Sequence, residues 1–300
     1  MAREYSRPIR LSIVTPVALM AGRLQNLYSW ISSIGDLPVE VILIHDKKDE
    51  KTGVELREIV NSLDNLKITI IEGIYGAPGL ARNAGLLIAA GEWVCFWDSD
   101  DLPQVEDFYV MVEAALASDS ECAVGGFTAV HDVTGERKSH LLTSNYLDEI
   151  AINPGIWRFA FKRSALENLD FSSLLMAEDQ LFLAKFGIPT RKIEIFSKSV
   201  YQYFVGENFH LTRNKIALQD LPTAVSYSFS LIGRLGNGDN RFSSILLSRQ
   251  VIAALRAGNT ATRLRVLKTL LLGLRSLCGS SRKEIFKCLW FVIRNRESIL

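Results

Sequence analysis

Three carboxylates follow an apolar run and form the chemically most suggestive group in this sequence. The run Trp93-Val94-Cys95-Phe96-Trp97 has the composition of a buried strand, and Asp98, Asp100 and Asp101 come directly after it. Open α/β sheets bind ligands where strands leave the sheet. Crowded carboxylates are costly unless a cation neutralises them, and Mg²⁺ and Mn²⁺ prefer oxygen ligands. The pattern indicates a Mn²⁺ or Mg²⁺ site that serves a phosphorylated ligand. The alternative is a solvated acidic turn in which Asp101 caps a helix that starts near Pro103.

Alternating strand and helix patterns surround this acidic turn. Apolar runs over 11–17, 39–44, 66–71, 93–97 and 122–127 predict strands. Helical spacing between them covers 24–34, 56–63, 78–90 and 104–117. Repeated βαβ units predict an α/β fold with a mostly parallel sheet sandwiched by helices. Neither Gly-x-Gly-x-x-Gly after the first strand nor Gly-Lys-Ser/Thr occurs, so a dinucleotide site or a P-loop has no support.

The composition is that of an ordered globular protein with an unevenly charged chain. Hydrophobic residues make up 48% of the 300 residues, charged residues 22%, and the formal net charge is +1. From residue 241 onward, 12 Lys or Arg face only Glu284 and Glu297, so the remainder is acidic. Four cysteines without metal-ligand spacing predict a reduced, cytoplasmic chain, and no apolar run reaches the roughly 18 residues of a membrane span. None of these patterns indicates a nucleic-acid partner.

An ordered set of motifs resembles the family 2 glycosyltransferases, which have a GT-A fold and invert the anomeric centre. The set consists of 11–17 (LSIVTPV), 39–46 (VEVILIHD), 79–85 (GLARNAG), 90–92 (AGE) and 98–101 (DSDD). The resemblance covers roughly residues 10 to 213. It implies a catalytic domain over 1–213, with a nucleotide-binding half at about 10–127 and an acceptor half at about 128–213. A basic helical C-terminal region would follow over 214–300.

The resemblance assigns the donor side of the site. Thr15, Pro16 and Val17 would lie beneath the nucleotide, Asp46 would contact the base, and Arg82 would lie near the nucleotide. Asp98 and Ser99 would contact the nucleotide sugar, with Asp98 near the ribose and metal and Asp100 as the principal metal ligand. A metal and Arg82 would stabilise the charge that a diphosphate leaving group gains in the transition state. The alternative for Arg82 is a solvated or ion-paired helix residue.

The resemblance also assigns an acceptor side. Asp179 matches the family's general base, which takes the proton of the acceptor hydroxyl, and Glu178 would orient the acceptor or Asp179. Trp157 would stack on a sugar face, or else lie in the core. His210 would complete the metal shell, or else be structural. Acidic residues at a helix start also have a simpler explanation, because they complement the helix dipole.

Two departures from the family pattern concern the base of the donor. Ala18-Leu19 replaces the usual Tyr-Asn pair after the first strand, and His45-Asp46-Lys47-Lys48 stands where relatives have two acids and Gly-Ser. The base therefore does not follow from these residues, although a UDP-sugar is the donor we expect.

The C-terminal region has the pattern of two basic amphipathic helices separated near Gly279, Ser280 and Ser281. Such helices bind anionic membrane surfaces, where each Lys or Arg near the surface contributes about 1 kcal/mol. Alternatively, they pack on the acidic part of the chain. If these helices bind a membrane, we expect the protein on the inner face of the cytoplasmic membrane.

The resemblance therefore implies an inverting, metal-dependent glycosyltransferase. It would move a sugar from a nucleotide diphosphate sugar to a saccharide or a lipid-linked glycan, in the synthesis of bacterial surface polysaccharide. Two alternatives are a sugar-phosphate nucleotidyltransferase and a non-catalytic scaffold that binds nucleotide sugars. The first would need a Gly-rich Arg-Leu loop, of which 20–24 (MAGRL) is a poor version.

Overall fold

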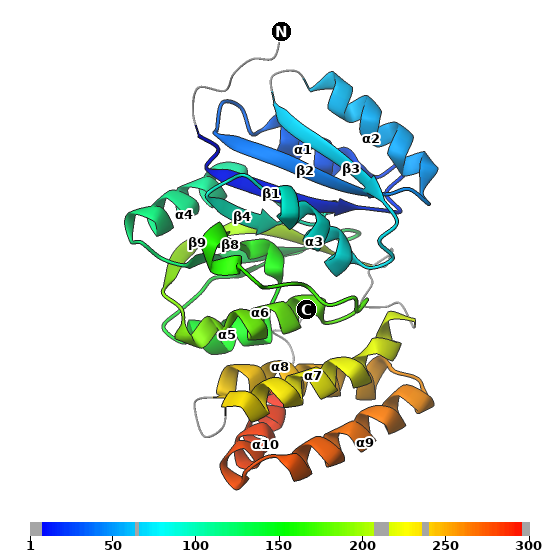
Figure 1. Ribbon diagram of the computed structural model, residues 1–300, viewed down its shortest axis with the longest axis vertical. Helices are drawn as coiled ribbons and strands as arrows, with labels where there is room; N and C mark the ends of the chain where they lie inside the picture. The colour runs from blue at the N-terminus through cyan, green and yellow to red at the C-terminus, as the bar shows by residue number, and fades with distance from the viewer. Residues whose placement is uncertain (1–7, 64–65, 207–215, 236–239, 296–300) are drawn as a thin grey trace. The chain divides into compact units, whose positions relative to one another are not determined.

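The computed structural model describes residues 8–63, 66–206, 216–235 and 240–295 (Figure 1). Contacts divide the chain into two compact units. Unit 1 contains residues 1–142, 156–168 and 191–204, and unit 2 contains 143–155, 169–190 and 205–300. The sequence predicts that the catalytic domain ends at residue 213, and this boundary stays a prediction.

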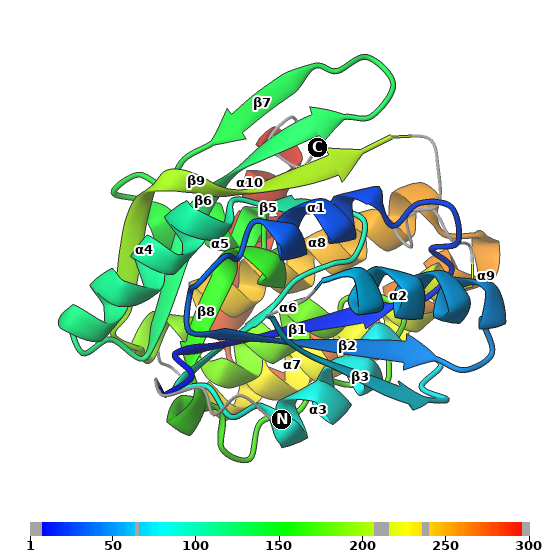
Figure 2. The same ribbon diagram turned by 90° about the horizontal axis from the view of Figure 1, so that it is seen from above.

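Unit 1 is built on a parallel sheet that the predicted strands form (Figure 2). In the order β3-β2-β1-β4, the strands are β3 (Lys67–Gly73), β2 (Val39–Asp46), β1 (Leu11–Val17) and β4 (Trp93–Phe96). All three pairings between them are parallel, with Leu11 opposite both Val39 and Trp93. The predicted α/β fold is confirmed.

Beyond β4 the strand pairings are antiparallel, whereas the sequence predicted that the strands would continue in parallel. The remaining strands are β8 (Phe159–Lys162), β6 (Cys122–His131), β7 (Arg137–His140), β9 (Ile193–Val205) and β5 (Leu102–Pro103). Strand β6, expected as one more parallel strand, pairs antiparallel with both β7 and β8. The sheet is therefore mixed, because residues 159–162 insert between β4 and β6.

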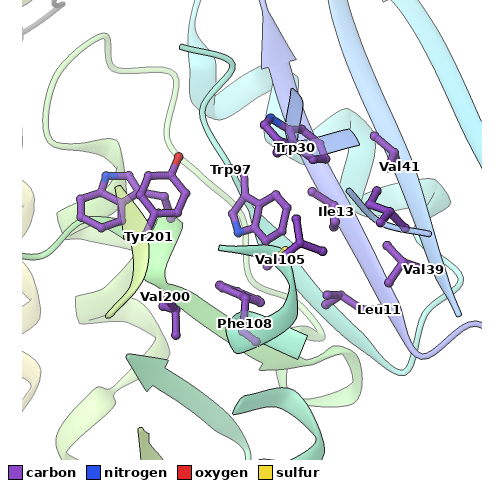
Figure 3. Packing of buried hydrophobic residues seen from close by; sticks show 14 of the residues in the cluster. Leu11, Ile13, Trp30, Val39, Val41, Trp97, Val105, Phe108, Val200 and Tyr201 are labelled. Carbon is purple, nitrogen blue, oxygen red and sulfur yellow. The ribbon is translucent and has the colours of Figure 1, made fainter. Parts of the chain in front are cut away.

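Helices cover both faces of the parallel strands, which explains their continuous apolar runs. The helices of unit 1 are α1 (Gln25–Ser32), α2 (Glu50–Ser62), α3 (Pro78–Ile88) and α4 (Val105–Ala117), and the 3-10 turns are η1 (Ile156–Arg158) and η2 (Arg163–Leu166). Ile13 and Val41 lie in one core cluster with Trp30 of α1 and Phe108 of α4 (Figure 3). Helix α3 packs on β1 and β2 so closely that a Cβ at Gly85 would lie 2.4 Å from Val14. Glycine is required at this contact.

Unit 2 is helical. Its helices are α5 (Tyr146–Ile152), α6 (Glu178–Phe186), α7 (Leu221–Leu235), α8 (Arg241–Ala257), α9 (Thr260–Ser276) and α10 (Gly279–Arg294), and its 3-10 turns are η3 (Ile188–Thr190) and η5 (Ala217–Asp220). Helix α8 is central, because it packs against α5, α7, α9 and α10. Among the described helices, none is long and apolar enough to cross a membrane.

One core joins the C-terminal helices to α6. It contains Leu181 of α6, Val225 of α7, Leu247 of α8, Val266 of α9 and Ile285 of α10. Residues 143–155 and 169–190 therefore fold with the C-terminal helices rather than with the sheet.

The break between the last two helices differs from the predicted one. It falls at residues 277 and 278, because α10 begins at Gly279 and includes Ser280 and Ser281. Ser281 is buried, and its hydroxyl accepts a hydrogen bond of 2.8 Å from Asn240. Small polar residues thus form the first turn of a helix here instead of ending one.

Candidate active site

The acidic turn is anchored by the residue that precedes it. Trp97 is fully buried and packs edge-to-face against Trp30 and Phe108, each with ring centroids 5.0 Å apart (Figure 3). Its backbone N–H donates to the Val14 carbonyl oxygen of β1 at 3.1 Å. The chain therefore leaves the sheet at a fixed place, and Asp98 follows at the carboxyl end of β4.

Asp98 forms an ion pair with the arginine expected beside the nucleotide. Arg82 Nη2 lies 2.8 Å from Asp98 Oδ1, and the two side chains are 5% and 30% exposed. A fixed guanidinium beside a half-buried carboxylate is a strong, charge-assisted contact. The structure thus brings together two of the predicted donor-side residues, which lie on α3 and after β4.

Two side chains distant in sequence hold the backbone of the acidic turn. The Asp98 N–H donates to the Tyr201 hydroxyl of β9 at 3.1 Å. The Asn26 side-chain amide of α1 donates to the Asp100 carbonyl oxygen at 2.8 Å. Sequence reasoning missed Asn26 as a part of the site, because Asn26 lies in no motif that would have indicated it.

Asp101 is the buried member of the acidic group. Its exposed fraction is 1%, and its Oδ1 accepts a hydrogen bond of 2.8 Å from the Phe204 N–H. Burial raises the pKa of Asp101 well above its ordinary value, and the charges of Asp100 and Asp98 raise it further. The expected helix follows this turn, with α4 beginning at Val105 and Gln104 in the cap position. Asp101 therefore binds the backbone of β9, and the predicted capping of that helix by Asp101 is wrong.

The ends of β1 and β2 provide the other predicted donor-side residues. Thr15 and Val17 are buried and Pro16 is partly buried at the end of β1. Ser99 is also buried. Since β1 lies between β2 and β4, these residues and the acidic turn share the carboxyl edge of three neighbouring parallel strands.

Asp46, at the end of β2, binds the loop that precedes α3. Its Oδ2 accepts from the N–H groups of Tyr75 and Gly76, both at 3.3 Å, and its Oδ1 accepts from Lys48 at 3.1 Å. Burial opposes the ionisation of Asp46, but these backbone donors prevail and hold its pKa below the ordinary value. Asp46 is therefore ionised and positioned at the sheet edge, and its contact with a base stays a prediction.

The predicted acceptor-side acids begin helix α6 in unit 2. Ala177, directly before them, has φ of 67°, a left-handed conformation that is costly for a residue with a Cβ. Glu178 is 8% exposed, and Asp179 Oδ1 accepts the Gln180 N–H at 2.7 Å. Backbone strain directly before a pair of acids is typical of functional sites.

Buried and partly buried polar contacts fix this end of α6 against the C-terminal helices. The Leu175 N–H donates to Asp220 Oδ2 at 2.7 Å. Gln180 Oε1 accepts from the Gln250 amide at 3.3 Å, and Gln250 Oε1 accepts from Ser228 at 2.9 Å. Helices α7 and α8 therefore help to position the pair of acids, a role that no motif in them indicates.

Trp157 lies in the core of unit 1. It is 8% exposed and stacks on Tyr201 and Tyr203, with ring centroids 4.5 and 5.3 Å away. Its position agrees with the core alternative, and its contact with an acceptor sugar stays a prediction. His210 lies outside the described residues.

The donor set of the acidic turn fits a divalent cation bound together with a phosphorylated ligand. Within the described residues, no group of three or more His, Cys, Asp and Glu side chains is arranged to hold a metal ion. Mg²⁺, however, usually binds one or two carboxylates together with substrate phosphates. Asp98 and Asp100 are partly exposed at the edge of the sheet and supply such hard oxygen atoms.

Comparison with known proteins identifies the family. The model described as "Glycosyl transferase family 2" matches residues 12–186, which is more than half of the chain. Glycosyltransferase GlyA of Streptococcus pneumoniae is 22% identical over 212 residues, 65% of this chain and 30% of GlyA. The poly(ribitol-phosphate) beta-N-acetylglucosaminyltransferase TarS of Staphylococcus aureus is 26% identical over 191 residues, 60% of this chain and 33% of TarS. The chain thus spans about a third of the length of these two relatives.

Solved structures share the fold. The structure of S. aureus TarS 1-349 in complex with UDP-GlcNAc superimposes with a TM-score of 0.67 at 17% identity, over 96% of this chain and 91% of that chain. The mannosyltransferase PcManGT of Pyrobaculum calidifontis, in complex with GDP-Man and Mn²⁺, gives a TM-score of 0.56 at 18% identity, over 98% and 88% of the two chains. The predicted GT-A architecture is confirmed.

Proposed function

Because the chain belongs to glycosyl transferase family 2, we propose that it transfers a sugar from a nucleotide diphosphate sugar to a hydroxyl group, with inversion and with the help of Mn²⁺ or Mg²⁺. The acidic turn after β4 carries the proposal. It combines the Arg82–Asp98 pair with Asp100 at the carboxyl edge of parallel strands. Complexes of structural relatives with UDP-GlcNAc and with GDP-Man and Mn²⁺ support a donor of this class.

The proposed chemistry is an in-line displacement at the anomeric carbon. Asp179 takes the proton of the acceptor hydroxyl as the new glycosidic bond forms, and the bond to the diphosphate breaks with its electron pair going to the leaving group. A divalent cation held by Asp98 and Asp100 would supply charge stabilisation to the diphosphate. Arg82 would add a fixed positive charge, and Glu178 would orient Asp179 or the acceptor.

The acceptor and the place of action are also part of the proposal. We propose a saccharide or lipid-linked glycan acceptor and a UDP-sugar donor, in the synthesis of bacterial surface polysaccharide at the inner face of the membrane. The relative TarS, a poly(ribitol-phosphate) beta-N-acetylglucosaminyltransferase, supports this setting. The family match favours a glycosyltransferase over a sugar-phosphate nucleotidyltransferase.

Ligand-dependent stability tests the donor site. Thermal unfolding is measured with UDP-GlcNAc, UDP-glucose and GDP-mannose, each with MnCl₂ or with EDTA, because ligands that bind only the folded state raise the unfolding temperature. We expect stabilisation that requires the metal. Asp100→Asn should abolish the metal-dependent part, and Asp132→Asn, in the loop between β6 and β7, serves as the matched control. An unchanged metal-dependent shift in folded Asp100→Asn protein contradicts the assignment of Asp100.

The second test separates binding from chemistry at Asp179. Asp179→Asn should keep the Mn²⁺-dependent affinity for UDP and lower donor turnover by about 10² to 10⁴, the range for loss of a general base. The control is Asp170→Asn, whose carboxylate pairs with Lys185 at 2.9 Å and is 72% exposed. Turnover is measured as release of UDP. A scaffold that only binds nucleotide sugars would release none, and undiminished turnover in Asp179→Asn protein would place the base elsewhere.

A further inference from the structure

The last two helices each present an apolar and basic side away from the core of unit 2. In Figure 1, α9 and α10 lie on the side of α7 and α8 opposite to α6. Helix α9 packs on α7 through Val266, and α10 packs on α8 through Ile285, Cys288 and Val292, all of which are buried. The opposite sides of both helices are exposed.

Helix α10 carries three large apolar side chains on its exposed side. Phe286, Trp290 and Ile293 follow one another at helical spacings of four and three residues, and they are 57%, 57% and 47% exposed. Arg282, Lys283, Lys287 and Arg294 are exposed around them. The Arg294 guanidinium lies 5.0 Å from the centre of the Trp290 ring. The cations thus flank the apolar stripe on the same side of the helix.

Helix α9 repeats this arrangement with leucines. Leu264, Leu267 and Leu271 are 63%, 40% and 60% exposed, again at spacings of three and four residues. Exposed cations lie beside them at positions 263, 265, 268 and 275. We call the exposed side chains of α9 and α10 together the α9–α10 face.

The α9–α10 face has one sign of charge. Between Thr260 and Arg294 there are eight Lys or Arg residues and a single acid, Glu284. Glu284 already pairs with Arg241 at 3.1 Å and with Lys287 at 3.6 Å. Within the described residues, no carboxylate pairs with Arg282, Lys283 or the four cations of α9. Most of the positive charge of the face therefore has no carboxylate partner in the described part of the chain.

We propose that the α9–α10 face docks on the surface of an anionic lipid bilayer. Helices with this composition lie in the membrane interface, with their apolar side chains in the headgroup region and their cations against lipid phosphates. A second copy of the chain is disfavoured, because two such faces would oppose like charges. Protein interfaces are also depleted in Lys, whereas this face contains three. The inference extends the proposed function, in which the acceptor is lipid-linked, but it is tested without donor, metal or acceptor.

Trp290 provides a direct spectroscopic probe of docking. Of the five tryptophans, Trp30, Trp93, Trp97 and Trp157 are buried and Trp290 is exposed. With the full chain, vesicles of phosphatidylcholine containing one third phosphatidylglycerol should shift the emission to shorter wavelength and carry the protein into the pellet. Vesicles of phosphatidylcholine alone should do neither, and added salt should weaken the binding through screening. In Trp290→Phe protein the shift should vanish.

Two double variants locate the surface. Phe286→Gln with Ile293→Gln, and separately Arg282→Gln with Lys283→Gln, should each weaken binding to the anionic vesicles at least tenfold. The control is Leu87→Gln with Val133→Gln, which replaces exposed apolar residues of unit 1 and should bind like the wild type. Circular dichroism and thermal unfolding check that each variant is folded. The charge variant alters only exposed side chains, so it tests the surface even if the apolar variant fails to fold.

Several results would overturn the proposal. They are equal binding to neutral and anionic vesicles, wild-type affinity in both folded double variants, or a stable dimer that the apolar variant dissociates while vesicles bind neither form. None of these results bears on Asp100 or Asp179, because the proposed transfer reaction is tested by metal-dependent binding and UDP release.

Discussion

A single hydroxyl group links the acidic turn to a strand about a hundred residues away. The Tyr201 hydroxyl accepts the Asp98 N–H, and the Tyr201 ring is fully buried against Trp157. Tyr201 is thus a positioning residue, since its hydroxyl holds the backbone of the turn at Asp98. Trp97 fixes the turn from the other side by packing on α1 and α4.

Removal of that hydroxyl should loosen the turn without disturbing the core. Tyr201→Phe keeps the ring, so we expect a normal fold and an affinity for UDP with Mn²⁺ that falls about tenfold, which corresponds to about 1.4 kcal/mol. Calorimetric titration with and without Mn²⁺ measures this. Tyr227→Phe, an exposed position on α7, is the control. If Tyr201→Phe protein binds UDP with Mn²⁺ as tightly as the wild type, Tyr201 contributes only to the packing of the core.

At the scale of elements, a buried carboxylate joins neighbouring strands of the parallel sheet. Glu40 of β2 accepts hydrogen bonds from the Ser12 hydroxyl of β1 at 2.6 Å and from the Ala90 N–H, before β4, at 2.7 Å. It also pairs with Lys67 of β3 at 2.9 Å. Burial opposes its ionisation, but these donors outweigh burial, and the pKa of Glu40 lies below its ordinary value of 4.5.

This lowered pKa makes the stability of the sheet sensitive to acid. A carboxyl group with a lower pKa in the folded state stabilises the fold above the unfolded value, near 4.5, and this contribution is lost as the pH falls through the folded value. Glu40→Gln should therefore lower the free energy of unfolding at pH 7 by about 1 to 3 kcal/mol, and the difference from wild type should shrink below pH 4.5. Urea denaturation at several pH values measures it, with Glu58→Gln, exposed on α2, as control. A difference that does not depend on pH would contradict the role of the charge.

At the scale of the whole molecule, the chain segment with the proposed base folds with helices that lie beyond the family match. The match ends at residue 186, yet α6 shares its core with α7 and α8 and is bonded to Gln250. Helices α7 and α8 pack on α6, whereas the alternative that the two basic helices pack on the acidic part of the chain stays a prediction. Their outward neighbours, α9 and α10, keep the exposed basic face that the membrane alternative requires.

A matched pair of substitutions on α8 tests this dependence. Leu247→Asp places a carboxylate in the core of unit 2, where the leucine is fully buried, and it should destabilise that unit by several kcal/mol. We expect faster proteolysis within residues 143–155 and 169–190 and loss of UDP release. Leu255→Asp, at an exposed position of the same helix, should leave both unchanged. Equal protease resistance in the two variants would show that α6 does not need α8.

The sequence by itself determined the elements and the order of the motifs. Apolar periodicity is a local property, so the strands at 11–17, 39–46, 67–73 and 93–96 and the helix at 105–117 lie where the pattern predicts them, within a few residues. The acidic turn follows its strand directly. Arg82 is ion-paired with Asp98, as the alternative for Arg82 expected, and its contact with a nucleotide stays a prediction. The roles of Asp46, Asp100, Trp157, Glu178 and Asp179 stay predictions.

The tertiary structure decided what depends on which strands become neighbours. Insertion of β8 beside β4 made the sheet mixed, and β9 brought Tyr201 to Asp98 across 103 positions of sequence. Asn26 and Gln250 gained their roles in the same way, through contacts with residues 74 and 70 positions away. No periodicity or motif encodes such contacts, because each depends on the packing of elements that are far apart in the chain.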